Sequence, residues 1–394
     1  MKKIILILLV ALLPALSAAG QGQFSGDTAT FTAELTSFMG TLVSKSEIAE
    51  IDLFKALYDS TCFSRETKDR IINVASQLRG RRISQAPGFV YFIRTLTDFV
   101  ETSQKKNEVS AWLEGLSEMA FDPRFSNASI EKFIEVTGLL LVDHTIYASG
   151  SVRWKTRGGK VEFVRDTVLK IDIRTVTLVG FLGKDSTEIH DFSGTYYPDL
   201  FRLHCKEGTV TWQKAGYDPS KVFATVSDFD IDVTKSEFSC DSSLLSHPDY
   251  FHEPVPGKLT DRAVEIVSPE KATMPRFETY ENRFFIEDIY RDVNYEGGLA
   301  LEGALVRGTG TNWFPASISL YRNDTLAIHV ASKNFLLSQK SISSIDASST
   351  LFLGRDSVFH SSLGFSYNAA TREVSMFRTN RSEEHTSELQ SRQS

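Results

Sequence analysis

At 394 residues the chain is long enough for two domains, since one hydrophobic core rarely serves more than about 250–300 residues. Apolar residues make up 41% and charged residues 24% of the sequence, a balance that is ordinary for a globular protein and argues against long disorder. The net charge of -7 provides no basic field for a phosphate backbone, so we expect no nucleic acid partner.

The first residues have the order of parts found in a secretory signal peptide. Lys2 and Lys3 precede an apolar run from Ile4 to Leu16, and small residues follow up to Gly20. The run is too short for a stable membrane anchor. We therefore expect residues 1–19 to be a signal peptide, with a hydrophobic first helix of the fold as the alternative. The protein is then exported, to the periplasm or to an outer-membrane-associated place, and its mature chain has no transmembrane helix.

Residues 27–147 have helical periodicity, because apolar residues recur every three or four positions. Ser64 is placed to cap one of the helices, and Asp122-Pro123 separates the last two. About six helices of moderate length, joined by short polar loops, predict an antiparallel bundle or a short helical array. Their apolar positions fall within Phe31–Leu42, Ile48–Leu57, Glu66–Leu78, Phe92–Phe99, Val109–Met119 and Ile130–Leu140.

Near Tyr147 the hydrophobic period changes from 3.6 to 2, which predicts β-structure from there on. Thr156-Arg-Gly-Gly159 predicts a hairpin turn between two of the strands. Each expected strand has one apolar and one polar face, as in an antiparallel sheet. We divide this half into a first β part at 148–263, an extended connector with two prolines at 264–278, and a β-repeat part at 279–378.

The last of these parts contains a ladder of short strands between Phe314 and Arg378, joined by turns of polar or small residues such as Arg322-Asn-Asp324 and Gly354-Arg-Asp356. The expected strands are Ala316–Tyr321, Leu326–Val330, Phe335–Leu337, Ser341–Ile345, Thr350–Leu353, Ser357–His360, Gly364–Tyr367 and Glu373–Phe377. The sequence therefore predicts an α+β fold. An N-terminal all-α bundle precedes an antiparallel short-strand β domain, built as an elongated sandwich, a jelly roll or a solenoid.

Two clusters of potential metal ligands lie in the first β part. Asp228, Asp230 and Asp232 alternate with apolar residues, so three carboxylates on one strand face could hold a hard cation such as calcium. The sequence lacks the Gly and the final carboxylate of an EF-hand loop, and a solvated acidic face that discourages edge pairing is the favoured interpretation.

The second cluster is His247, Asp249, His252 and Glu253, whose side chains are zinc-ligand types within one Pro-rich loop. The prolines forbid a helical zinc motif, and a plain surface loop is the favoured interpretation. Neither cluster is assigned as a metal site. No catalytic residue and no cofactor are assigned either, and we expect a protein that is not an enzyme.

Cysteines and tryptophans supply the remaining candidates. Cys205 and Cys240 lie in the β half and can pair if their strands are neighbours, whereas Cys62 is expected to be a small buried side chain. Trp154, Trp212 and Trp313 could stack on sugars, although core positions are commoner for this residue.

The segment from Arg381 to Ser391 matches the translation of a widely used DNA sequencing adapter over all of its residues. We therefore expect 381–394 to be a non-native, adapter-derived tail, and the natural protein to continue beyond Asn380. On that expectation the chain is a fragment, and its last strand is a cut surface.

The order of signal peptide, Phe-rich helical segment and short-strand repeats resembles a group of large uncharacterised exported proteins of Gram-negative bacteria. The segments 331–338 and 345–354 are similar to the β-repeats of lipopolysaccharide-transport (OstA-like) proteins. That resemblance implies an open-sided β-structure able to shelter an acyl chain. The leading hypothesis is an exported envelope protein without enzymatic activity, either a scaffold or a lipid- or glycolipid-binding β-structure, with other envelope proteins as further partners. A carbohydrate-binding or adhesive module is the first alternative, and a secreted metal-dependent hydrolase is the second.

Overall fold

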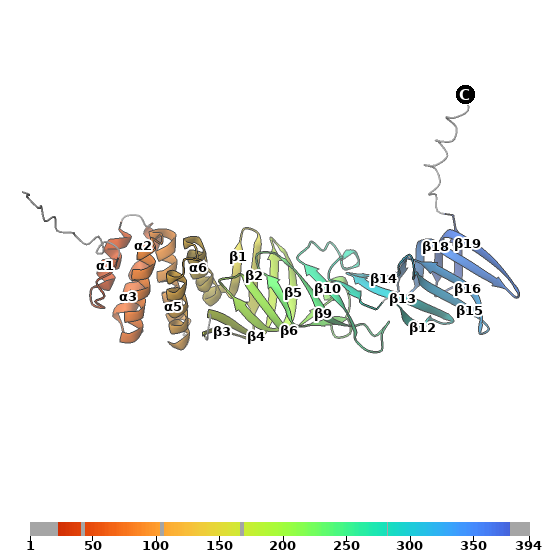
Figure 1. Cartoon of the computed structure of the whole chain (residues 1–394), viewed down its shortest axis with the longest axis horizontal. Coiled ribbons are helices and arrows are strands. Elements are labelled where there is room, and N and C mark those ends of the chain that lie inside the picture. Colours follow the sequence, from red (N-terminus) through yellow and green to blue (C-terminus); the bar gives the residue numbers. More distant parts are fainter. Residues whose placement is uncertain (1–22, 41–43, 103–105, 166–168, 282, 379–394) are drawn as a thin grey trace, which may run out of the picture. The chain divides into compact units, whose positions relative to one another are not determined.

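The computed structural model describes residues 23–40, 44–102, 106–165, 169–281 and 283–378 (Figure 1). The chain divides into two compact units, Met1–Val142 and Asp143–Ser394. A helical first unit and a large antiparallel β-sheet in the second confirm the predicted α+β class. The predicted signal peptide and the predicted adapter-derived tail lie outside the described residues.

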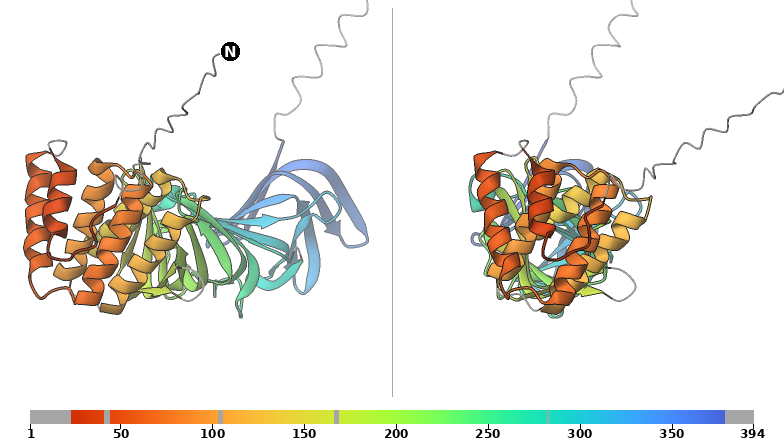
Figure 2. Two further views of the ribbon diagram at one scale, coloured as in Figure 1. Left: turned by 60° about the vertical axis from the view of Figure 1, so that its left-hand side comes forward. Right: turned by 90° about the vertical axis from the view of Figure 1, so that its left-hand side faces the viewer.

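The described part of the first unit, called the helical unit here, contains six α-helices that lie alongside one another (Figures 1 and 2). They are α1 (Phe31–Met39), α2 (Lys45–Asp59), α3 (Arg65–Gly80), α4 (Val90–Glu101), α5 (Lys106–Phe121) and α6 (Asn127–Asp143). Aromatic side chains fill much of its core, and the ring of Phe92 stacks on Trp112 with centroids 5.8 Å apart.

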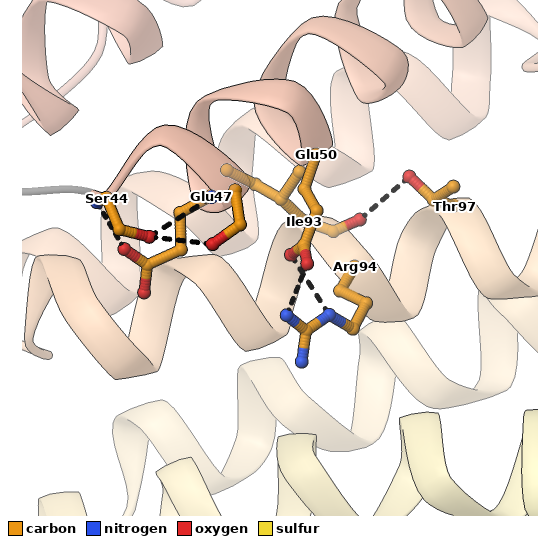
Figure 3. Close-up of polar contacts among 7 residues, drawn as sticks. Ser44, Glu47, Glu50, Ile93, Arg94 and Thr97 are labelled. Carbon is orange, nitrogen blue, oxygen red and sulfur yellow. Dashed lines mark hydrogen bonds and ion pairs between the residues drawn. The ribbon is translucent and has the colours of Figure 1, made fainter.

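Local sequence signals define α2 and connect it to α4 (Figure 3). The Ser44 side chain accepts a hydrogen bond from the Glu47 backbone N–H, and the Glu47 carboxylate accepts one from the Ser44 backbone, which is a capping box. On the next turn the Glu50 carboxylate receives two hydrogen bonds from Arg94 on α4, at 3.0 and 2.5 Å. Ser64 caps α3, as predicted.

The second unit, called the β unit here, begins with β1, and twenty strands are linked by hydrogen bonds in its described residues. The first ten are β1 (Thr145–Ser149), β2 (Val152–Arg157), β3 (Lys160–Arg165), β4 (Leu169–Leu182), β5 (Asp185–Tyr197), β6 (Arg202–Thr211), β7 (Phe223–Val226), β8 (Phe229–Asp232), β9 (Glu237–Ser246) and β10 (Val255–Arg262). The others are β11 (Arg276–Thr279), β12 (Phe284–Tyr290), β13 (Val293–Glu302), β14 (Leu305–Thr309), β15 (Ala316–Arg322), β16 (Thr325–Ser332), β17 (Asn334–Leu337), β18 (Ser341–Leu353), β19 (Asp356–Asn368) and β20 (Glu373–Phe377).

A recurrent feature of the sheet is a long strand that pairs with a different short strand along each half. In β4, residues 177–182 pair with β2 and residues 169–174 pair with β3. The predicted hairpin at Gly158-Gly159 is therefore wrong, since β2 uses its two edges for β1 and β4. The two glycines, both at positive φ, instead connect β2 to β3, which pair with different halves of β4. A Cβ on Gly159 would lie 2.4 Å from the carbonyl oxygens of Arg174 and Thr175.

The predicted ladder is also corrected, because four of its short strands are two long ones. Ser341–Ile345 and Thr350–Leu353 are parts of β18, and Ser357–His360 and Gly364–Tyr367 are parts of β19. The pairing between β18 and β19 shifts register near Ala347. Such a bulge bends both strands without ending them. The predicted turns at 322–324 and 354–356 do connect strands.

The predicted connector at 264–278 is only partly a connector, because β11 begins at Arg276 and pairs with both β10 and β13. β13 is the most shared strand: its first half pairs with β12 and β15, and its second half pairs with β11 and β14. The first β part and the β-repeat part are thus joined through one continuous ladder of strands.

Candidate functional site

The interior of the β unit is filled by its own large side chains over most of the sheet. Trp154, Trp212, Tyr295 and Phe365, from β2 to β19, are each 0% exposed. Alternate residues of the strands point to this interior, as the period of 2 predicts. Exposed apolar side chains are therefore expected where this packing stops.

Packing stops at the end of the β18–β19 hairpin, residues 352–359, which we call the hairpin tip. β16 pairs with β18 at residues 348–351 and β20 pairs with β19 at residues 364–368, so among the described strands no third strand pairs with residues 352–359. Leu353 and Val358 lie on one face, and Phe352 and Phe359 lie on the other. These four side chains are 62, 56, 39 and 65% exposed, respectively.

The three aspartates of the predicted acidic face do not all lie on one strand. Asp230 and Asp232 belong to β8, but Asp228 precedes the strand with a φ of 55°. His204 on β6, which the sequence analysis did not single out, lies beside Asp228 and Asp230. Its Nδ1 is 3.0 Å from an Asp230 carboxylate oxygen, and its Nε2 is 3.7 Å from an Asp228 carboxylate oxygen. Its place between the inward-facing Leu203 and Cys205 is the signal that could have indicated this position.

Asp232 faces a different partner. Its carboxylate accepts hydrogen bonds from the Thr234 hydroxyl and backbone N–H, which hold the pKa of that carboxyl below its usual value. Within the described ranges, no group of three or more His, Cys, Asp or Glu side chains could hold a metal ion. The three aspartates are therefore not gathered into one such group.

The His247 loop differs from a plain surface loop in one residue. His247 is only 3% exposed, whereas Asp249, His252 and Glu253 are exposed and do not gather around it as zinc ligands would. The ring of His247 makes edge-on contacts with Tyr250 at 4.8 Å and with Tyr217 at 5.5 Å between centroids. Within the loop interpreted as a plain surface loop, His247 itself is therefore buried.

The tryptophans considered for sugar stacking differ in exposure. Trp154 and Trp212 are fully buried, and their ring N–H groups donate to the carbonyl oxygens of Lys235 and Pro275. Neither can present a ring face to a sugar. Trp313 is 88% exposed.

The cysteines also depart from expectation. Cys62 is exposed and not buried, and Cys205 and Cys240 are buried free thiols. Burial raises the pKa of the Cys205 and Cys240 thiols, which makes both poor nucleophiles.

We expect one thiol per chain to react with a maleimide in the native protein and all three to react after unfolding in urea, because only Cys62 is accessible. Mass spectrometry of the labelled protein checks the count. A Cys62→Ser variant should show no native labelling. Fast native labelling of that variant would contradict the burial of the other two thiols.

Comparisons with protein-family models, with curated proteins and with solved structures find no match to this chain. Among the helices that the structure describes, none is long and apolar enough to cross a membrane. The candidate site is therefore identified from geometry alone, and it is the hairpin tip with its exposed apolar side chains.

Proposed function

We propose that the protein is an exported envelope protein without enzymatic activity, a β scaffold that binds lipid or glycolipid through its hairpin tip. The observation that carries this proposal is the exposure of large apolar side chains on both faces of residues 352–359. The charged, apolar and small parts of residues 1–20 support export.

Exposure on both faces favours a lipid over a protein partner. A protein that packs against a sheet covers one face, whereas an amphiphile layer surrounds a projecting hairpin and covers Leu353 and Val358 together with Phe352 and Phe359. The turn itself is polar, with Arg355 and Asp356, and among the described strands none pairs with the outer edge of β19 at the tip. The backbone groups along such an edge need water or lipid headgroups as partners, so the proposed depth is the interface and not the hydrocarbon centre.

The test is co-sedimentation of the full chain with vesicles of phosphatidylethanolamine and phosphatidylglycerol, prepared with and without lipopolysaccharide. In the double variant Val358→Asp/Phe359→Ser, binding should weaken by at least about tenfold. Burying one large apolar side chain contributes about 1.5–3 kcal/mol, and about 1.4 kcal/mol corresponds to a factor of ten.

The matched control is Val267→Asp/Phe285→Ser, which makes the same two substitutions at residues 77 and 63% exposed but outside the tip. It should bind like the unmodified protein. Equal loss in both double variants would argue against a role of the tip. No sedimentation of the unmodified protein would leave only the scaffold part of the proposal.

A further inference from the structure

A cavity of about 350 Å³ lies elsewhere in the β unit and shares no residue with the hairpin tip. Its lining comes from Tyr217, from the turn after β9, from β14 and the residue before it, and from β17 and the β17–β18 connection. β14 and β17 are paired, with Val306 opposite Leu337, so their side chains meet at one wall. The volume is in the range of small-molecule sites, about 300–1,000 Å³.

His247 lines this cavity and has no partner for its polar atoms. Among the described residues, neither Nδ1 nor Nε2 makes a hydrogen bond, although His247 is only 3% exposed. Its position is fixed by the edge-on contacts with Tyr217 and Tyr250, which line the cavity as well. Leaving a buried polar group unpaired costs free energy, so a bound group that pairs with it is favoured.

The chemistry of a neutral imidazole limits the chemical groups of a ligand that can pair with His247. Burial lowers the pKa of His247, so near pH 7 the ring is uncharged, with one N–H donor and one acceptor nitrogen. A hydroxyl both donates and accepts, so it can pair with either nitrogen in either tautomer. A carboxylate only accepts and an ammonium only donates.

The rest of the lining is amphipathic and carries no net charge. Leu305 and Leu336, 38 and 40% exposed, provide an apolar wall, and Ser338 and Gln339 provide neutral polar groups. Its charged residues are Asp249 and Lys340, which are opposite in sign. This combination does not select an ion, and it fits the apolar and hydroxyl-bearing faces of a neutral polyol ring.

We propose that this cavity binds a neutral, hydroxyl-rich molecule the size of one sugar ring, one hydroxyl of which hydrogen-bonds His247. A free sugar and the sugar headgroup of a glycolipid share this chemistry. The site is independent of lipid binding at the hairpin tip.

The experiment titrates the full chain by calorimetry with methyl β-glucoside and, below its critical micelle concentration, with n-octyl β-glucoside. His247→Phe keeps a ring against the two tyrosines but removes the polar atoms, and we expect it to weaken binding by about tenfold or more. His247→Gln restores a donor and an acceptor and should recover part of the affinity. Leu336→Ser tests the apolar wall, with Ile345→Ser, 74% exposed and outside the cavity, as its control.

Equal affinity of both glycosides would identify the sugar ring as the ligand, and a preference for the octyl compound that is lost in Leu336→Ser would identify a glycolipid headgroup. Both results support the site. The proposal is overturned if neither glycoside binds, which would mean that only water occupies the cavity, or if His247→Phe binds as tightly as the unmodified protein. The Val358→Asp/Phe359→Ser variant should retain glycoside binding, so a failure here is distinguishable from a failure at the tip.

Discussion

Replacing Trp154 by Ala is expected to destabilise the β unit by about 3–5 kcal/mol, the cost of removing a large buried aromatic side chain. The Trp154 ring is 0% exposed, and its Nε1 donates to the carbonyl oxygen of Lys235 at 2.7 Å. On the facing strand, a Cβ on Gly180 would lie 2.8–2.9 Å from three carbon atoms of the ring. The variant would therefore leave both a cavity and an unpaired carbonyl group.

Urea unfolding followed by circular dichroism measures this loss. Trp313→Ala is the matched control, because Trp313 is 88% exposed and an exposed substitution changes stability by only about 0.5 kcal/mol. Similar unfolding midpoints for the two variants would show that Trp154 is not part of the packed interior, and would return it to the list of sugar-stacking candidates.

Stability is expected to fall by about 3 kcal/mol for each of two buried carboxyl groups as the pH rises from about 4 to 7. Asp98 in the helical unit and Asp261 in the β unit are 8 and 5% exposed. Burial raises the pKa of each to about 6, from an ordinary value of 3.8. One pKa unit corresponds to about 1.4 kcal/mol.

The direction of this change in stability with pH follows from proton binding in the folded and unfolded chain. Both carboxyl groups bind a proton more tightly in the folded chain, so the extra stability is complete below about pH 4 and is lost as the pH rises through about 6. Around Asp98, the positive charge of Arg94 opposes the effect of burial, whereas Glu50 and Glu101 add to it. At Asp261, hydrogen bonds from Thr187 and the Arg262 backbone and the charge of Lys214 oppose it.

Urea midpoints measured between pH 4 and 8 test this expectation. Asp98→Asn and Asp261→Asn should each remove part of the slope, because an amide does not titrate. Asp241→Asn, at an exposed position, is the control and should leave the slope unchanged. A flat profile in the unmodified protein would contradict both raised pKa values.

The helical half could be predicted closely because its signals are local. The spacing of Phe31 and Leu35 and the cap at Ser64 depend only on neighbouring residues, and α1 and α3 lie where these signals place them. The strands of the ladder were divided wrongly for an equally local reason. A bulge shifts the phase of the alternation, so Ile345, 74% exposed, marks the end of a pattern but not the end of β18.

The candidate site was less accessible to sequence reasoning. The ring of His247 contacts Tyr217, and the cavity beside it is lined in part by Leu336, which is remote in sequence. The exposure of Phe352 and Phe359 depends on where β16 and β20 stop pairing, and no property of residues 352–359 alone indicates that. Both sites are products of tertiary structure.

The division of long strands between short neighbours has a consequence for how the sheet can form. Among the described strand pairs, none joins residues farther apart in sequence than Val306 and Leu337. Contacts of such short sequence separation carry a small loop-closure cost and favour fast folding. Each new strand therefore finds its partners in the segment that has just preceded it, and the β unit can grow from its first strand while the chain is still emerging. Longer-range contacts, such as the one between Trp154 and Lys235, are expected to form after these strand pairs.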